Sequence, residues 1–311
     1  METGASASGG LLQFDRSSVS AALRKYFHSR DRAQRFVPAA VTAVAFLALF
    51  GGPLRLLVQD WWNLPEAGHG LLLAPAAAWL AWRAGIQARS APNHVLGIAI
   101  LVVAVLIRYL SGLAAELFTM RESMVLALVG LTVYNYGARQ VVWWWLPFTL
   151  AALSIPLPEL VTQQLALPLQ FRASRIGATL LSSRHVPVLL TGNVIRLPGR
   201  ELFVTEACSG LRSLTALLSL GVLMGGIWLK HPLSRLILVA IAIPVAIVVN
   251  GVRVFLTGFL VFFVSPSLGE GFMHLTEGWL LFLVSFASLG FFAWAFVLGE
   301  RQLARWRTRA A

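Results

Sequence analysis

The sequence is poor in charged residues, which make up only 12% of its 311 amino acids. An ordinary globular chain carries roughly 25% charged residues, so a soluble domain of this composition could not cover its own surface. Hydrophobic residues, by contrast, make up 58% of the chain. The composition therefore excludes a cytosolic enzyme, a secreted domain and a disordered adaptor, and it indicates an integral membrane protein.

Cysteine is also nearly missing, because Cys208 is the only one in the chain. A single cysteine excludes a disulfide framework and a thiolate metal cluster within one chain. The six histidines are scattered without ligand-like spacing, so we expect no metal and no organic cofactor.

The apolar residues gather in eight segments that are candidates to cross a bilayer, which takes a helix of about 20 residues. These predicted spans are Val37–Val58, Gly68–Trp82, Val95–Leu113, Met120–Tyr136, Val141–Pro156, Ser209–Leu229, Leu236–Leu256 and Gly278–Leu298. The predicted fold class is an all-α polytopic membrane protein with about eight transmembrane helices. We expect a cytoplasmic N-terminal tail over 1–36, a transmembrane domain over 37–298, and a basic cytoplasmic tail over 299–311.

The net charge of +12 comes from basic residues that flank the apolar segments instead of lining one face. This placement favours the positive-inside pattern of membrane proteins over a nucleic-acid surface. With the N-terminus inside, most of the basic residues lie on the cytoplasmic side, whereas the short outer loops hold acids such as Asp60, Glu66, Glu270 and Glu277. Both termini are therefore predicted to be cytoplasmic.

One long segment, 157–207, is predicted to be inserted on the outer side between the fifth and sixth spans. Its first half, Glu159–Ser183, has apolar residues at roughly helical spacing, and we predict a helix that lies on the outer membrane interface. Its second half, Val186–Val204, is broken by Gly192-Asn193 and Pro198-Gly199, which are turn signals. A small strand-like meander is expected there.

Three reactive residue types fall at the outer ends of predicted spans, namely Cys208, Arg253 and His274. A thiol becomes a nucleophile as the thiolate, which a helix N-terminus and a nearby arginine stabilise. A histidine can take the proton and return it to a leaving amine, and backbone N–H groups can receive the oxyanion. This combination predicts a cysteine acyl-transfer site on the extracytoplasmic side.

Each of these residues also has a structural interpretation, and spacing alone supports the catalytic one only weakly. A lone cysteine in an apolar bundle is usually a small core residue. An arginine at a span end often reaches for lipid headgroups, and a loop histidine is usually just solvated.

The residues around these positions resemble the exosortase/archaeosortase family. The resemblance rests on Glu206-Ala207-Cys208-Ser209-Gly210-Leu211-Arg212, then Asn250-Gly251-Val252-Arg253, then His274, with further likeness at His69-Gly70-Leu71-Leu72-Leu73-Ala74-Pro75 and Pro156-Leu157-Pro158. It covers roughly Trp61 to Trp279. Archaeal members tend to carry arginine where this chain has His274, so the chain is more similar to the bacterial exosortases.

The resemblance implies a membrane cysteine protease or transpeptidase in the bacterial inner membrane, with Cys208 as nucleophile and Arg253 and His274 as its catalytic partners. It also implies the partners: membrane-anchored exported proteins whose C-terminal sorting signal (PEP-CTERM-like) combines a short motif, a transmembrane helix and a basic cluster. Such enzymes cleave near the motif through a thioester and can pass the acyl group to an acceptor. Nucleic acid is not an expected partner.

Four further residues are candidates for supporting roles. Arg212, one helical turn after Cys208, either holds the thiolate or a substrate carboxylate, or is a structural anchor. Glu206 either orients His274 or Arg253, or caps the sixth span, and the cap is favoured. His69 either lines the site or is structural. We expect Asn250 to satisfy backbone groups where Pro244 and Gly251 disturb the seventh span.

Two other functions stay open from sequence alone, a multi-spanning transporter and a non-catalytic scaffold of an envelope polysaccharide export system. A transporter should show polar residues near several span centres or paired broken helices. Here the polar residues cluster at one outer edge, with Arg108 a partial exception. A scaffold would not need a thiol at a helix N-terminus.

Overall fold

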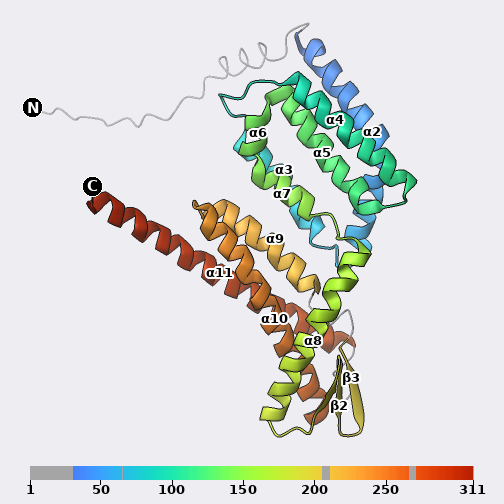
Figure 1. The fold of residues 1–311 in the computed structure, drawn as a ribbon, viewed down its shortest axis with the longest axis vertical. Helices are drawn as coiled ribbons and strands as arrows, with labels where there is room; N and C mark the ends of the chain where they lie inside the picture. Colours follow the sequence, from blue (N-terminus) through green and yellow to red (C-terminus); the bar gives the residue numbers. More distant parts are fainter. Residues whose placement is uncertain (1–30, 65, 205–210, 266–270, 311) are drawn as a thin grey trace, which may run out of the picture. The chain divides into compact units, whose positions relative to one another are not determined.

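The computed structural model describes residues 31–64, 66–204, 211–265 and 271–310, which are largely helical (Figure 1). The chain divides into two compact units, Met1–Gly52 and Pro53–Ala311, and α2 (Asp31–Asn63) begins in the first and ends in the second. The further elements are α3 (Gly70–Ala84), α4 (His94–Leu113), α5 (Leu117–Tyr136), α6 (Ala138–Trp143), α7 (Trp145–Leu153), α8 (Glu159–Ser183), β1 (Leu189–Thr191), β2 (Val194–Leu197), β3 (Arg200–Phe203), α9 (Leu211–Trp228), α10 (Pro232–Phe263) and α11 (Gly271–Ala310).

The all-α polytopic fold class is confirmed, because six described helices are long and apolar enough to cross a membrane. They correspond to the predicted spans one, three, four, six, seven and eight. The predicted second span is α3, whose 15 residues rise only about 22 Å at 1.5 Å each. That is less than the hydrocarbon thickness of about 30 Å.

The predicted fifth span differs from the structure, because the chain breaks at Trp144 into two short helices, α6 and α7. Pro147 in the first turn of α7 has no N–H to donate to the carbonyl of Trp143, so one continuous helix would lose that hydrogen bond. The ring N–H groups of Trp143 and Trp144 instead donate to the carbonyls of Ala84 and Gly85, which end α3.

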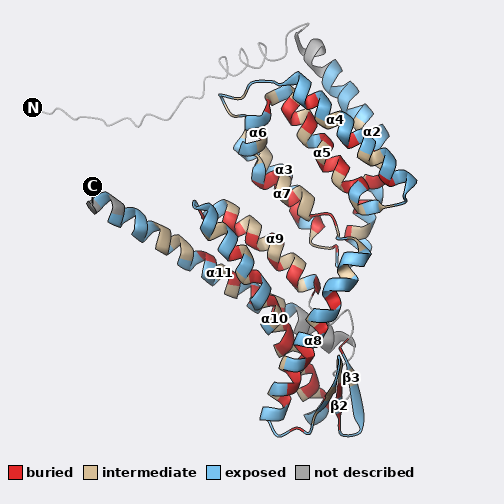
Figure 2. Cartoon of the chain, viewed as in Figure 1, coloured by how far each residue is buried: buried red, intermediate tan, exposed pale blue. Residues whose placement is uncertain are grey.

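Helices α3 to α7 form the first packed group of the second unit. α4 packs along α5, α5 also contacts α6 and α7, and α3 packs on α7. Because α5 has neighbours on several sides, half of its most apolar 18-residue stretch is buried inside the protein. The corresponding stretch of α4 is only 17% buried. Figure 2 shows this contrast as more buried residues on α5 than on the neighbouring α4.

Helix α10 is central to the second group, since it packs against α8, α9 and α11. The predicted helix Glu159–Ser183 is confirmed as α8, and its place on the outer membrane interface stays a prediction. The face that packs consists of small and polar residues, which are Ala166, Gln170, Ala173, Ser174, Gly177 and Ala178, together with Leu181. Leu160 and Leu165, two apolar residues of the predicted interfacial helix, point away from this contact and are exposed. Small side chains occupy the contact between α8 and α10 because they let two helix backbones approach closely.

The predicted meander is confirmed as a three-stranded antiparallel sheet in the order β1-β2-β3 (Figure 1). Its two turns fall at the predicted dipeptides, since Thr191 pairs with Val194 and Leu197 pairs with Arg200. Gly192 and Gly199 have φ values of 64° and 76°, which only glycine adopts without strain. β2 buries Ile195 and Leu197 in a cluster shared with α8 and α10.

Candidate active site

Two of the predicted catalytic residues, Arg253 and His274, lie on helices that pack on each other, α10 and α11. Arg253 lies on α10, which contacts both α9 and α11. Cys208 and Glu206 lie outside the described residues, in the sequence just before α9. His274 was expected in a loop, but the structure extends α11 to Gly271 and so places His274 in its first turn. The side chain of His274 is outside the described residues.

The described residue that precedes the Cys208 segment, Val204, is held firmly. Its N–H donates to the carbonyl of Asn193 at 3.0 Å, and its carbonyl accepts from the Asn193 amide at 3.1 Å. The same amide reaches Gln170 of α8 at 3.3 Å. Val204 is buried in the cluster that contains Val254 of α10. The end of the sheet is therefore tied to α8 and joined to α10 next to Arg253.

The described residue that follows the Cys208 segment, Leu211, is buried as well. It shares a second apolar cluster with Ala166 of α8 and Ala246 of α10. Ala246 and Val254 lie one helical turn on either side of Asn250 along α10. Both flanks of the Cys208 segment thus belong to clusters that meet α10 around the Asn250–Arg253 stretch.

The Asn250–Arg253 stretch is itself packed tightly against α8. A Cβ atom added at Gly251 would lie 2.5 Å from Cγ2 of Ile176, so only glycine fits there. Asn250 is 6% exposed, and the Nε atom of Arg253 is buried. The expectation that Pro244 and Gly251 disturb this helix differs from the structure, because α10 is one helix from Pro232 to Phe263. Gly251 instead allows close approach of α8, which fixes the position of Arg253.

Two supporting candidates, Arg212 and His69, come together through Glu66. Arg212 in the first turn of α9 forms an ion pair with Glu66 at 3.4 Å, although both side chains are about half exposed. His69 donates from Nε2 to the carbonyl of Leu153 at 3.2 Å. Burial lowers the pKa of His69 below its usual 6.5, and hydrogen bonds to the backbone of Leu153 and Glu66 offset only part of this shift. His69 is therefore held mainly as the neutral imidazole in the turn before α3.

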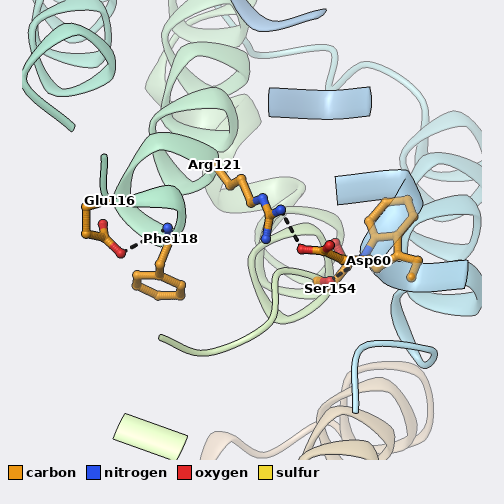
Figure 3. A network of polar contacts seen from close by, with 6 residues as sticks. Asp60, Glu116, Phe118, Arg121 and Ser154 are labelled. Atoms are coloured by element: carbon orange, nitrogen blue, oxygen red, sulfur yellow. Dashed lines mark hydrogen bonds and ion pairs between the residues drawn. The ribbon is translucent and has the colours of Figure 1, made fainter. Parts of the chain in front are cut away.

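An ion pair that the sequence analysis did not single out lies beside this region. Nη2 of Arg121 on α5 is 2.5 Å from Oδ2 of Asp60 near the end of α2, and the Arg121 side chain is 4% exposed. Figure 3 shows the two side chains directed at each other. The next residue after Asp60, Trp61, donates its ring N–H to the carbonyl of Ser154 at 2.7 Å. Arg121 lies inside the predicted fourth span, where a charged side chain is costly unless it is paired. That position could have marked Arg121 as a functional or structural residue from the sequence.

The same picture shows how α5 begins. One carboxylate oxygen of Glu116 accepts a backbone hydrogen bond from Phe118 at 3.0 Å (Figure 3). The other carboxylate oxygen accepts from the backbone N–H of Thr119 at 2.7 Å. This satisfies two of the free N–H groups at the helix start. The start of α5, and with it Arg121, is therefore fixed in place.

A family model described as a transmembrane exosortase matches residues 61–291 of the chain. The chain belongs to the transmembrane exosortase family. The match begins at Trp61 and extends to Phe291 in α11, so it contains every residue discussed in this site except Asp60. No curated protein and no solved structure matches the chain. The exosortase is thus a multi-pass membrane protein whose shared family region includes the α8–α11 group and the sheet.

Proposed function

We propose that this exosortase is a membrane-embedded cysteine peptidase or transpeptidase that cleaves C-terminal sorting signals of membrane-anchored proteins. Family membership supports a sorting function. The observation that carries the residue assignment is the anchoring of Val204 and Leu211, the described neighbours of the Cys208 segment, to α10 on both sides of Asn250. Arg253 lies on that same stretch of α10.

In the proposed reaction the thiolate of Cys208 is the nucleophile. Free cysteine has a pKa near 8.5, and a helix N-terminus lowers it because the free N–H groups there stabilise the anion. α9 begins three residues after Cys208. Arg253 adds positive charge and a planar set of N–H donors for the oxyanion of the tetrahedral intermediate.

The steps balance as an acyl transfer. The thiolate sulfur forms a bond to the scissile carbonyl carbon, and the C–N bond then breaks. His274 supplies the proton that the departing amine takes, so the products are a thioester on Cys208 and a free amine. Water or an acceptor amine next attacks the thioester, returns a proton to His274, and releases the thiolate.

The substrates in this proposal are held by one transmembrane helix that carries a short motif on its outer side and a basic cluster at its inner end. Confinement to the bilayer raises the effective concentration of the motif at the enzyme, as a linker would. The site then faces outward from a bacterial inner membrane, and both termini are cytoplasmic, in agreement with the distribution of basic residues.

Co-expression with a candidate sorting-signal protein tests this function. The wild type should shorten the substrate, with a new C-terminus near the motif seen by mass spectrometry. Cys208→Ala should insert normally and yield no shortened product, while Ser182→Ala, an exposed hydroxyl on α8, should behave as wild type. Processing by the Cys208→Ala variant would remove the nucleophile assignment.

Thiol labelling separates the enzyme from a transporter or scaffold of the same topology. Because Cys208 is the only cysteine, a maleimide reports on that residue alone. The rate of labelling from the outside, measured against pH, should titrate with a midpoint below 8.5. A midpoint at or above 8.5, or labelling only from the inside, would contradict an activated thiolate on the outer face.

A further inference from the structure

A cavity of about 420 Å³ lies among α3, α5, α7 and the last part of α2. Its walls are almost wholly apolar, with residues such as Leu57, Ala77, Met124 and Leu128 facing it. Two of the lining residues, Ala78 and Leu128, are also exposed, so the cavity is open on one side. A soluble ligand would find few hydrogen-bond partners here, whereas a hydrocarbon chain would be well matched.

The length of the cavity follows from the residues of α5 that line it, which extend from Met124 to Tyr136. Twelve residues at 1.5 Å each give about 18 Å along the helix. One leaflet of a bilayer has about 15 Å of hydrocarbon, half of the core thickness. The cavity therefore has the length of one acyl chain in one leaflet.

Polar side chains lie at both ends of the cavity, and one end also adjoins positive charge. At one end, Trp61 and Ser154 line the wall and are bonded to each other. The other end is lined by Asn135, Tyr136 and Trp144, and it adjoins a loop that carries arginines.

Two of these arginines, Arg89 and Arg139, are exposed beside the lining residue Tyr136. Ser90 donates its hydroxyl to the carbonyl of Tyr136, and Arg139 donates to the carbonyl of Arg89 at 3.5 Å. The sequence has no Asp or Glu over residues 67–115 or over residues 123–158, so this end of the helices has no acidic side chain of its own. The local charge is positive.

This arginine loop is built into the structure by side-chain hydrogen bonds. Gln140, which is fully buried, accepts from the N–H of Gln87 at 2.8 Å and donates to the carbonyl of Gly85 at 3.0 Å. Trp144 donates to the same carbonyl at 3.0 Å. The loop is therefore held against the end of the cavity that Tyr136 and Trp144 line, and Arg89 and Arg139 stay beside that end.

We propose that the cavity is a binding site for an anionic glycerophospholipid, with one acyl chain between α3 and α5 and the phosphate at Arg89 and Arg139. Basic pockets between transmembrane helices are suited to acidic headgroups. A transmembrane helix is a poorer occupant, because a cylinder about 10 Å wide and 30 Å long occupies more than about 2,000 Å³. A basic cluster at the end of such a helix would also be repelled by the arginines.

Native mass spectrometry of the detergent-purified protein, loaded with an equimolar mixture of phosphatidylglycerol and chain-matched phosphatidylcholine, tests the proposal. The wild type should retain phosphatidylglycerol over phosphatidylcholine by about tenfold or more. Replacing both arginines (Arg89→Gln with Arg139→Gln) should abolish that preference. The matched control, Arg172→Gln with Arg175→Gln, removes two exposed arginines of α8 and should keep it.

A second variant addresses the acyl chain. Ala78→Phe places a ring in the cavity from an exposed position, so the fold should tolerate it, and retention of both lipids should fall by about tenfold. Equal retention of the two lipids by the wild type would overturn the proposal, as would a preference that survives loss of both arginines. Displacement of the bound lipid by a sorting-signal helix peptide would assign the cavity to a helix instead. Cys208→Ala should leave lipid retention unchanged, so this result is independent of the proposed peptidase activity.

Discussion

Arg121 and Asp60 lie 61 residues apart in the sequence, yet their side chains form an ion pair at 2.5 Å between α5 and α2. The Arg121 side chain is 4% exposed and the Asp60 side chain 28% exposed, so the pair is largely removed from solvent. Because Trp61 next to Asp60 is bonded to Ser154, the pair helps to fix α7 as well as α2 and α5. The pair lies near the C-terminal end of α2, and the Glu66–Arg212 contact follows shortly after that end in the sequence.

Loss of one partner of this pair should be costly, because it leaves a buried charge without its counterion. We expect Asp60→Asn to lower the free energy of unfolding by about 3 kcal/mol, at the low end of the range for buried pairs because Asp60 retains some exposure. Replacing both residues (Asp60→Asn with Arg121→Met) should recover most of the loss. Reversible unfolding in mixed detergent micelles measures both.

The control for that experiment is an exposed ion pair of similar geometry. Arg196 and Glu201 lie 2.7 Å apart on neighbouring strands, with side chains that are 52% and 45% exposed. Arg196→Met should therefore change stability by less than about 1 kcal/mol. If Asp60→Asn and Arg196→Met changed the free energy of unfolding equally, burial of the Arg121–Asp60 pair would make no difference to stability.

A pair of glycines on α10 provides a test of the α8 contact. At Gly251 an added Cβ would lie 2.6 Å from the Cβ of Ile176, which cannot move without its helix, and overpacking of this kind costs about 1–3 kcal/mol. At Gly258 the nearest atom is the flexible tip of Leu181 at 2.8 Å. We expect Gly251→Ala to lower the thermal midpoint in detergent and Gly258→Ala to change it little. The reverse order would contradict the packing of α8 on α10.

Arg253 should matter for activity more than for folding. Arg253→Lys keeps the positive charge but loses the planar arrangement of donors, so processing of a sorting-signal substrate should fall by at least about tenfold. The measurement is the initial rate of product formation at equal enzyme in the membrane. Arg172→Lys, on an exposed face of α8, should keep the wild-type rate. Unchanged processing by Arg253→Lys would reduce Arg253 to a structural anchor.

His69 predicts a pH dependence of stability. Its pKa is lowered in the folded protein, so below its usual value of 6.5 the unfolded chain binds more protons than the folded one. The stability that neutral His69 contributes is fully present above about pH 6.5, and it decreases as the pH falls below that value. Between about pH 7.5 and about pH 5.5 the thermal midpoint of the wild type should drop more than that of His69→Gln. A His185→Asn variant, changed at an exposed histidine, should drop as the wild type does.

Much of the helical layout could be predicted from the sequence, because it depends on local composition. The long apolar runs that became α2, α4, α5, α9, α10 and α11 are visible without any tertiary information. The two turns of the sheet were also local, since Gly192 and Gly199 mark them directly. The break at Trp144 was missed because an apolar run does not show where its hydrogen bonds fail, although Pro147 was the available clue.

The residues of the candidate site divide in the same way. Cys208, Arg253 and His274 stand out in sequence because reactive and charged types are rare in an apolar chain. The neighbours of His69 and Arg212 could not be predicted, since Leu153 and Glu66 are distant in sequence and carry no pattern that pairs them. Such contacts depend on how helices pack, which periodicity does not encode.

By itself, the amino-acid sequence determined that the chain crosses the membrane repeatedly, where its long apolar helices and the two turns of its sheet fall, and which few polar residues have chemistry to offer. Only the tertiary structure decided that α8 packs on α10 through Gly177 and Gly251, that Arg121 pairs with Asp60, and that an apolar cavity forms among α2, α3, α5 and α7. The physical reason is that hydrophobicity and backbone preference act within a helix or a turn. Close approach, ion pairing and empty volume arise between segments that are far apart in the chain.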